Sequence, residues 1–210
     1  MTTAHDIERS LYDWAPRELA MAWDNVVLLV GDPAQEVRRI LVALDITQGV
    51  AEEAVSLGAQ MIVSHHPVMN CAWHEVQTLR ADDAQGRLLR YLVRHGHAAC
   101  CMHTNLDAAE GGVNEVLAGI FGMRNWEPFA GGCGRVGEVD PIPVPELAKK
   151  AQDALGKRCN LPETGPAVQV KYTDSGRPVR RLAVISGAGG SLFEEAIAVG
   201  ADCLLTGEAN

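Results

Sequence analysis

The chain has 210 residues, of which 47% are hydrophobic and 21% charged, a composition typical of an ordinary globular protein. Its net charge of -9 disfavours nucleic-acid binding through a broad basic face, because an acidic surface repels phosphate backbones. The N-terminus has no apolar signal core and no apolar run is long enough to span a bilayer, so we expect a cytoplasmic protein without membrane spans.

Strand and helix patterns alternate along the chain. We expect strands at residues 25–30, 40–44, 61–64, 98–102, 167–172, 182–185 and 203–206. Helices are expected at residues 47–57, 82–95, 110–121, 145–155 and 192–199. The glycine-rich stretch 131–137 is expected to be irregular. This alternation predicts an α/β fold with largely parallel strand pairing.

Two segments of the sequence resemble each other at a constant offset. Residues 37–66 align with residues 179–208, and both segments have a strand-helix-strand pattern. An internal duplication and the period shared by all such units explain the likeness equally well. The alignment places His66 opposite Glu208, each just after a strand. Ligands of open α/β sheets gather at the carboxyl ends of strands, so Glu208 is a candidate to face a functional cleft.

Four residues with metal-binding side chains follow two successive expected strands. His65 and His66 come directly after one strand, and His103 and Asp107 follow the next. Imidazole and carboxylate groups are ligands of borderline and hard divalent metals. The four residues therefore predict a metal centre, either one tetrahedral site or two sites with open positions.

These features also have structural explanations. Two adjacent histidines can be one core residue and one surface residue. Asp107 and Glu110 form an Asp-x-x-Glu pattern that predicts an N-cap for the 110–121 helix. The glycines at 187–190 can hold a phosphate through their amides, although the missing P-loop lysine favours a tight turn. Residues 23–25 can line a pocket, or serve packing and capping only.

The order of several motifs resembles that of the Nif-three-like dinuclear-metal proteins, also known as GTP cyclohydrolase 1 type 2 homologues. The motifs are Ala22-Trp23-Asp24-Asn25, Ser64-His65-His66-Pro67, His103-Thr104-Asn105-Leu106-Asp107, Gly134-Arg135-Val136-Gly137-Glu138, Ser186-Gly187-Ala188-Gly189-Gly190 and Thr206-Gly207-Glu208. The resemblance covers essentially the whole chain. It implies two similar α/β lobes, approximately residues 1–125 and 126–210, with mixed, largely parallel sheets facing a shared metal cleft.

The resemblance also implies a site, a cofactor and an assembly. His65, His66, His103 and Asp107 match the family's ligands of two divalent metal ions per subunit, for which zinc, iron and manganese are all suitable. The family's remaining ligands lie in a C-terminal His-x-x-x-Glu segment. The sequence ends at Asn210 without a match to it, so we expect a C-terminal segment to be missing. The implied assembly is a homohexamer. Further candidates for contacts with substrate or cleft are Asn25, Asn105 and Glu208.

Two functions of different classes are open at this point. The first is a metal-dependent hydrolase of the GTP cyclohydrolase 1 type 2 kind, acting on a purine nucleotide or related heterocycle. That reaction type follows from the resemblance, whereas the residues alone support metal-assisted hydrolysis. The alternative is a non-catalytic metal-binding or regulatory partner-binding module. A third interpretation, a nucleotide-binding protein, depends on the 187–190 turn.

Overall fold

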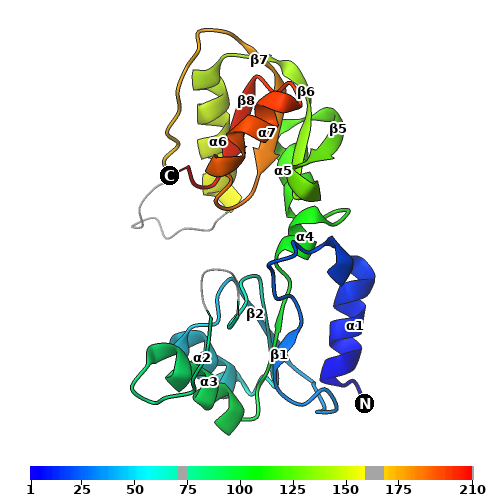
Figure 1. The fold of residues 1–210 in the computed structure, drawn as a ribbon, viewed down its shortest axis with the longest axis vertical. Coiled ribbons are helices and arrows are strands. Elements are labelled where there is room, and N and C mark those ends of the chain that lie inside the picture. Colours follow the sequence, from blue (N-terminus) through cyan, green and yellow to red (C-terminus); the bar gives the residue numbers. More distant parts are fainter. Residues whose placement is uncertain (71–74, 159–167, 210) are drawn as a thin grey trace. The chain divides into compact units, whose positions relative to one another are not determined.

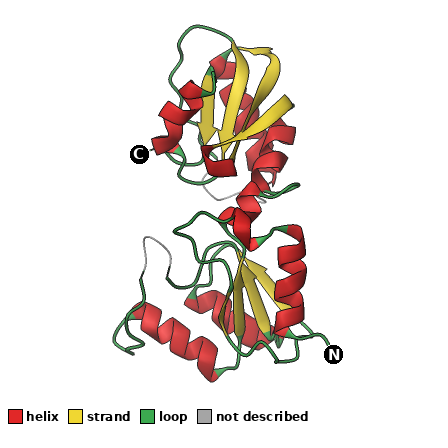
Figure 2. Cartoon of the chain, turned by 45° about the vertical axis from the view of Figure 1, so that its right-hand side comes forward, coloured by secondary structure: helices red, strands yellow, loops and turns green. Residues whose placement is uncertain are grey.

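A computed structural model describes residues 1–70, 75–158 and 168–209. The chain divides into two compact units, Met1–Glu110 and Gly111–Asn210, and each contains one four-stranded sheet. Figure 2 shows the strands in yellow and the helices that flank them in red. The α/β fold class predicted from the alternating patterns is confirmed. Among the described residues, no helix has the length and apolar character needed to cross a membrane.

The first unit is a largely parallel sheet with helices on both faces. Its elements are α1 (Ala4–Trp14), β1 (Leu28–Val30), β2 (Ile40–Ala43), α2 (Gln48–Leu57), β3 (Met61–Ser64), α3 (Ala84–Arg94), β4 (Ala98–Cys101) and α4 (Thr104–Ala108), with a 3-10 turn at Arg17–Leu19. The strand order is β1-β4-β3-β2, in which β2, β3 and β4 are parallel and β1 is antiparallel. In Figure 1, α1 lies on one side of this sheet and α2 and α3 on the other.

Local signals in the sequence determine where α2 and α3 begin and end. Thr47 caps α2 by accepting a hydrogen bond from the Val50 amide at 3.2 Å. Gly58 ends the helix with a φ of 63°, a conformation that favours glycine. Asp83 caps α3 by accepting from the Gly86 amide at 2.7 Å. Both helices were predicted from their apolar spacing, and the end of α2 from Gly58, whereas the two N-caps were not predicted.

The central strands of the first sheet, β3 and β4, are buried on both faces. Ile62 and Ala99 pack against α2 and α3, while Met61 and Ala98 pack under α1. These strands are consequently apolar at nearly every position, as expected for a parallel sheet covered on both sides. Because β3 and β4 run parallel in register, their carboxyl ends lie next to each other. The candidate site is located at these ends.

The second unit has a mixed sheet. Its elements are α5 (Val113–Phe121), β5 (Arg124–Phe129), β6 (Gly134–Ile142), α6 (Val144–Arg158), β7 (Val179–Ile185), α7 (Phe193–Ala198) and β8 (Cys203–Thr206), with 3-10 turns at Ala130–Gly132 and Gly190–Leu192. The strand order is β5-β6-β7-β8. Only β7 and β8 are parallel, and the pairs β5–β6 and β6–β7 are antiparallel. Residues of α5 and α6 pack against one face of this sheet.

Some expectations from the sequence are wrong in this unit. Residues 134–137 of the glycine-rich stretch are strand and not irregular, because antiparallel neighbours on both sides of β6 pair with its backbone. Residues 131–133 lie outside the strand, as expected. A Cβ on Gly137 would lie 2.8 Å from the Arg124 carbonyl oxygen, so the glycine serves close strand packing. The strand expected at 167–172 is absent over residues 168–172, and Ala167 lies outside the described residues. Strand β5 was missed in this unit, and helix α1 was missed in the first unit.

The two aligned segments of the sequence have the same structure. The units β2-α2-β3 and β7-α7-β8 are both parallel, and the register is conserved at the same offset. Ile40 pairs with Met61 just as Leu182 pairs with Cys203. Gly58 and Gly200 both adopt positive φ, at 63° and 77°.

Side-chain contacts of the two segments agree as well. In each segment, the polar side chain just before the second strand accepts hydrogen bonds from the backbone amides of two successive arginines. These arginines lie at the start of the first strand or just before it. The pairs are Gln60 with Arg38 and Arg39, at 2.9 and 3.0 Å, and Asp202 with Arg180 and Arg181, both at 2.9 Å. A shared strand-helix-strand period does not require such contacts, so they favour an internal duplication.

Candidate metal centre

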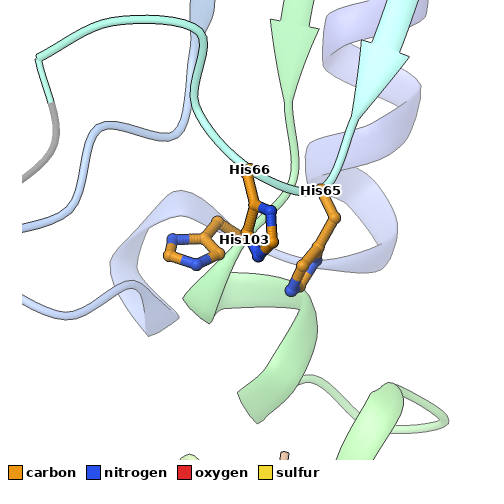
Figure 3. A group of neighbouring side chains, drawn as sticks. All are labelled: His65, His66 and His103. Carbon is orange, nitrogen blue, oxygen red and sulfur yellow. The ribbon is translucent and has the colours of Figure 1, made fainter. Parts of the chain in front are cut away.

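The carboxyl ends of β3 and β4 bring together His65, His66 and His103 (Figure 3). One ligand atom from each ring lies within 4.8 Å of the others. Asp107 joins the group, with its Oδ1 atom 3.9 Å from Nε2 of His65. The four residues that the sequence predicted to meet do lie at one place, within the first unit.

Backbone geometry explains this convergence. Ser64 pairs with Cys101 at the ends of the parallel strands, and the Met102 amide donates to the Ser64 carbonyl oxygen at 2.9 Å. The histidines that follow each strand therefore leave the sheet side by side. Helix α4 begins directly after His103, and the Asp107 amide donates to the His103 carbonyl oxygen at 3.0 Å. Residues four apart in one helical turn share a side, which brings Asp107 to the histidines.

The prediction that Asp107 caps the next helix is wrong. Asp107 lies inside α4, whereas α5 begins at Val113 with Gly112 as its N-cap residue. Gly111 adopts a φ of 68° between the two helices, a conformation that interrupts a continuous helix. The helix expected from residue 110 is therefore shorter. Asp107 is therefore a residue of α4 and not the N-cap residue of α5.

Each histidine is oriented by a hydrogen bond at Nδ1. The acceptors are the Met102 carbonyl oxygen for His65 (2.9 Å), the Asp45 carboxylate for His66 (2.7 Å) and the Asp24 carboxylate for His103 (2.9 and 3.0 Å). Carbonyl and carboxylate oxygens only accept, so the ring proton resides on Nδ1 and the lone pair on Nε2. Metal-binding histidines are held by acceptors in this way, with the other ring nitrogen directed at the ion.

Asp24 is held more firmly than Asp45. The Asp24 side chain is fully buried, whereas that of Asp45 is 54% exposed. Besides His103, Asp24 accepts hydrogen bonds from the Asn25 amide at 2.8 Å, the Thr104 amide at 3.0 Å and the Thr104 hydroxyl. Burial alone raises the pKa of the Asp24 carboxyl, but the hydrogen bonds from His103 and Thr104 outweigh burial and lower this pKa to about 2. Asp24 is therefore an anion at neutral pH.

His65 is favoured in its neutral form. Burial lowers its pKa; the Asp107 carboxylate opposes this effect, and the neighbouring rings of His103 and His66 act in the same direction as burial. A neutral imidazole is the form that binds metals. The Asp107 carboxyl group next to it would itself be a ligand.

This donor set fits a divalent cation. Two donors that share an ion, each about 2.1 Å away from it, are at most about 4.2 Å apart. The 3.9 Å between His65 Nε2 and Asp107 Oδ1 satisfies this limit. Three imidazoles and a carboxylate suit zinc, iron and manganese among others. The described residues thus include a group able to hold a metal ion.

The further candidates from the sequence lie in different surroundings. Asn105 is completely buried, and its amide donates to the Ala15 carbonyl oxygen at 2.8 Å and accepts from the His103 amide at 2.9 Å. These bonds position the His103 backbone and engage both ends of the side chain. The side-chain amide of Asn25 donates to the Met69 carbonyl oxygen at 3.1 Å. Glu208 follows β8 in the second unit, and its substrate contact stays a prediction.

The orienting roles of Asp24 and Asp45 were not predicted from the sequence. Asp24 is separated from His103 by 79 residues, so no local periodicity connects them. Asp45 follows β2 closely, and the rule that ligands gather at the carboxyl ends of parallel strands indicates it as a candidate. Asp24 required the tertiary structure.

The glycine-rich turn at 187–190 has the contacts of a tight turn. The Gly189 amide donates to the Thr206 hydroxyl at 2.9 Å, and the Gly190 amide donates to the Glu208 carbonyl oxygen at 3.1 Å. A Cβ on Gly189 would lie 2.2 Å from Ile185 Cγ2. These two amides are therefore used within the protein, which weakens the nucleotide-binding interpretation.

Comparison with known proteins finds a matching family and similar relatives. The family model of Duf34/NIF3 (NGG1p interacting factor 3) matches residues 2–210. A GTP cyclohydrolase 1 type 2 homolog of Streptomyces coelicolor is 36% identical over 203 residues, which cover 92% of this chain and 68% of the relative. Another, from Clostridium perfringens, is 31% identical over 212 residues, covering 97% and 76%.

A solved structure is also similar. The Staphylococcus aureus hypothetical protein SA1388 superposes with a TM-score of 0.78 at 28% identity. The match covers 99% of this chain and 79% of that one.

Proposed function

Because the chain belongs to the Duf34/NIF3 family, we propose that it is a dinuclear-metal-binding protein and a metal-dependent hydrolase of the GTP cyclohydrolase 1 type 2 kind. Its substrate in this proposal is a purine nucleotide or a related heterocycle. The ligands are His65, His66, His103 and Asp107, and the protein acts in the cytoplasm as a homohexamer.

One observation carries the proposal. Three histidines from two strand ends each present Nε2 as the lone-pair nitrogen, because every Nδ1 is held by an acceptor. Histidines with purely structural roles have no need of a shared orientation toward one another. The buried Asp107 carboxylate beside them supplies negative charge, which a cation would balance.

A bound divalent metal supplies two kinds of chemistry here: it acidifies water and polarises an electrophile. The residues of the chain have the supporting roles. Asp24 and Asp45 keep His103 and His66 in the tautomer that binds metal. Asn105 holds the His103 backbone in place, and α4 carries Asp107 to the group.

Metal content tests the ligand assignment. We expect His65→Ala and Asp107→Ala to retain less metal than the parent protein by elemental analysis after dialysis. His5→Ala is the matched control, because His5 is a surface residue of α1 in the same unit. Equal metal content in parent, His65→Ala and Asp107→Ala would remove the assignment.

Turnover is tested separately on the metal-loaded protein. Incubation with GTP is expected to give a formamide-opened or pterin product, and Asp107→Ala is expected to abolish it. Inactivity toward GTP and a nucleotide panel would contradict the hydrolase proposal while leaving the metal site intact.

A non-catalytic module is the second candidate. The description of the family, which names an interacting factor, favours this reading. The same fold and the same metal group suit both functions, so fold does not decide between them. Metal binding without turnover, together with a specific partner recovered by pull-down, would support the module.

A further inference from the structure

Trp23 is a large aromatic residue beside the metal-binding histidines, and the proposed function so far gives it no role. Its ring centroid lies 6.0 Å from that of His103, with the two ring planes at 71°. Trp23 is 47% exposed, although a tryptophan is on average highly buried because its ring carries a large apolar surface. An exposed aromatic ring next to a candidate ligand is well placed to contact a molecule that binds there.

The chain around Trp23 is anchored to the start of α4. The Asp24 amide donates to the Met21 carbonyl oxygen at 2.9 Å, which closes a turn with Trp23 at its centre. The Met21 amide donates to the Thr104 hydroxyl at 2.9 Å, and the Thr104 amide donates to the Asp24 carboxylate at 3.0 Å. Both ends of the turn are thus bonded to the residue that follows His103. The backbone of Trp23 is therefore held in place before a ligand arrives, which lowers the entropic cost of binding.

The chemistry of the neighbouring group selects the kind of ligand that Trp23 would contact. Aromatic faces attract cations, but divalent ions at the histidines would repel a cationic ligand. A planar heteroaromatic ring gains from stacking on an indole face and carries no such penalty. Binding sites for small molecules commonly combine an apolar or aromatic wall with a few polar groups that fix the orientation of the ligand. Trp23 supplies such a wall, and the metal group supplies the polar part.

We propose that Trp23 is a specificity-determining residue whose indole face stacks on the planar heteroaromatic ring of a ligand bound at the candidate metal centre. This role rests on the proposed function and names the part of the substrate that is recognised. A ligand then needs a polar or anionic group for the metal centre and a flat ring for Trp23. One purine-sized molecule spans the 6.0 Å between the ring centroids of Trp23 and His103. A sugar phosphate or an aliphatic peptide lacks the flat ring.

Calorimetric titration of the zinc-loaded protein with GTP tests the proposal. The GTP dissociation constant of Trp23→Ala is expected to rise about 5- to 150-fold, the range found when an aromatic partner of a stacked base is replaced by alanine. Trp23→Phe keeps an aromatic face, so its constant is expected to stay closer to that of the parent. Trp14→Ala is the matched control and should bind GTP like the parent, since Trp14 is a 53% exposed tryptophan on α1 of the same unit. Elemental analysis compares the zinc content of all variants.

Tryptophan fluorescence supplies a readout that a purely structural role of Trp23 would not change. A stacked guanine quenches the emission of an indole ring, so GTP is expected to quench the parent and Trp14→Phe alike. Trp23→Phe is expected to bind GTP and to lose most of this quench, because the stacked ring no longer emits at the wavelength of an indole. This comparison remains decisive if Trp23→Ala does not fold.

The outcomes separate this role of Trp23 from the proposed function. Equal GTP affinity in the parent and Trp23→Ala overturns the stacking role and leaves the proposed function standing. Loss of zinc together with GTP binding in Trp23→Ala, or an undiminished quench in Trp23→Phe, overturns the stacking role as well. A zinc-loaded parent that binds neither GTP nor any member of a nucleotide panel overturns both the stacking role and the proposed substrate class.

Discussion

Replacing Asp24 by asparagine tests whether the carboxylate behind His103 governs metal binding. Asp24 accepts hydrogen bonds from the His103 ring, the Thr104 amide and hydroxyl, and the Asn25 amide. Each oxygen serves at least one backbone N–H group. In Asp24→Asn, one oxygen becomes an NH2 donor that faces a backbone donor, whichever way the amide is turned.

The expected magnitude has two parts. Leaving a buried donor without an acceptor costs about 1–3 kcal/mol of folding stability. Loss of the orienting carboxylate lowers metal affinity by about 10- to 100-fold, as for other partners behind metal ligands. That factor corresponds to about 1.4–2.7 kcal/mol. An asparagine NH2 that donates to Nδ1 of His103 would also move the ring proton to Nε2 and block the ligand atom.

Competition with a chromophoric zinc chelator measures the affinity, and thermal unfolding of the metal-free protein measures the stability. Asp202→Asn is the matched control, because Asp202 accepts hydrogen bonds from two backbone amides in the second unit. We expect the control to lose stability and to bind zinc like the parent. Parent-like zinc affinity in Asp24→Asn would refute the orienting role.

Two further predictions concern stability. Hydrogen bonds from the Arg180 and Arg181 amides lower the pKa of Asp202. As the pH falls, Asp202 is therefore protonated in the unfolded chain before it is protonated in the folded protein. Its contribution to the free energy of unfolding is complete above the ordinary carboxyl pKa of about 3.9. That contribution is lost as the pH falls through the lower pKa of the folded state. Urea unfolding between pH 6 and about pH 3 should show a steeper loss for the parent than for Asp202→Asn, and equal slopes would contradict this. Gly86→Ala in α3 should lose about 1–3 kcal/mol, because a Cβ there would lie 2.2 Å from the Arg80 carbonyl oxygen. Gly119→Ala in α5, with no atom within 4 Å of the new Cβ, should gain about 0.4–1 kcal/mol in the same urea assay. A gain in both would show that the close approach at Gly86 relaxes freely.

The sequence predicted most elements of the first unit, because its signals are local. The prediction used the stop at Gly58, the apolar spacing of α2 and α3 and the apolar run 61–64, all of which act within a few residues of their position. The four strand-end residues were also identified from the sequence, since parallel strands place their carboxyl ends on one edge of a sheet. The parallel pairing of β3 and β4 accounts for the proximity of these residues.

Strand β6 was missed because its glycines resemble a loop, and its hydrogen bonds come from neighbours distant in the chain. The prediction that Asp107 is an N-cap was wrong because Gly111 separates α4 from α5. The Asp-x-x-Glu pattern on which it rested does not report the positive φ of Gly111. Nor did the sequence indicate that Asp24 holds His103 from 79 residues away. Residue type and short spacing determined which side chains bear metal chemistry and which strands carry them. Only tertiary packing decided which acceptors orient their rings, because such contacts depend on loop closure between segments with no common period.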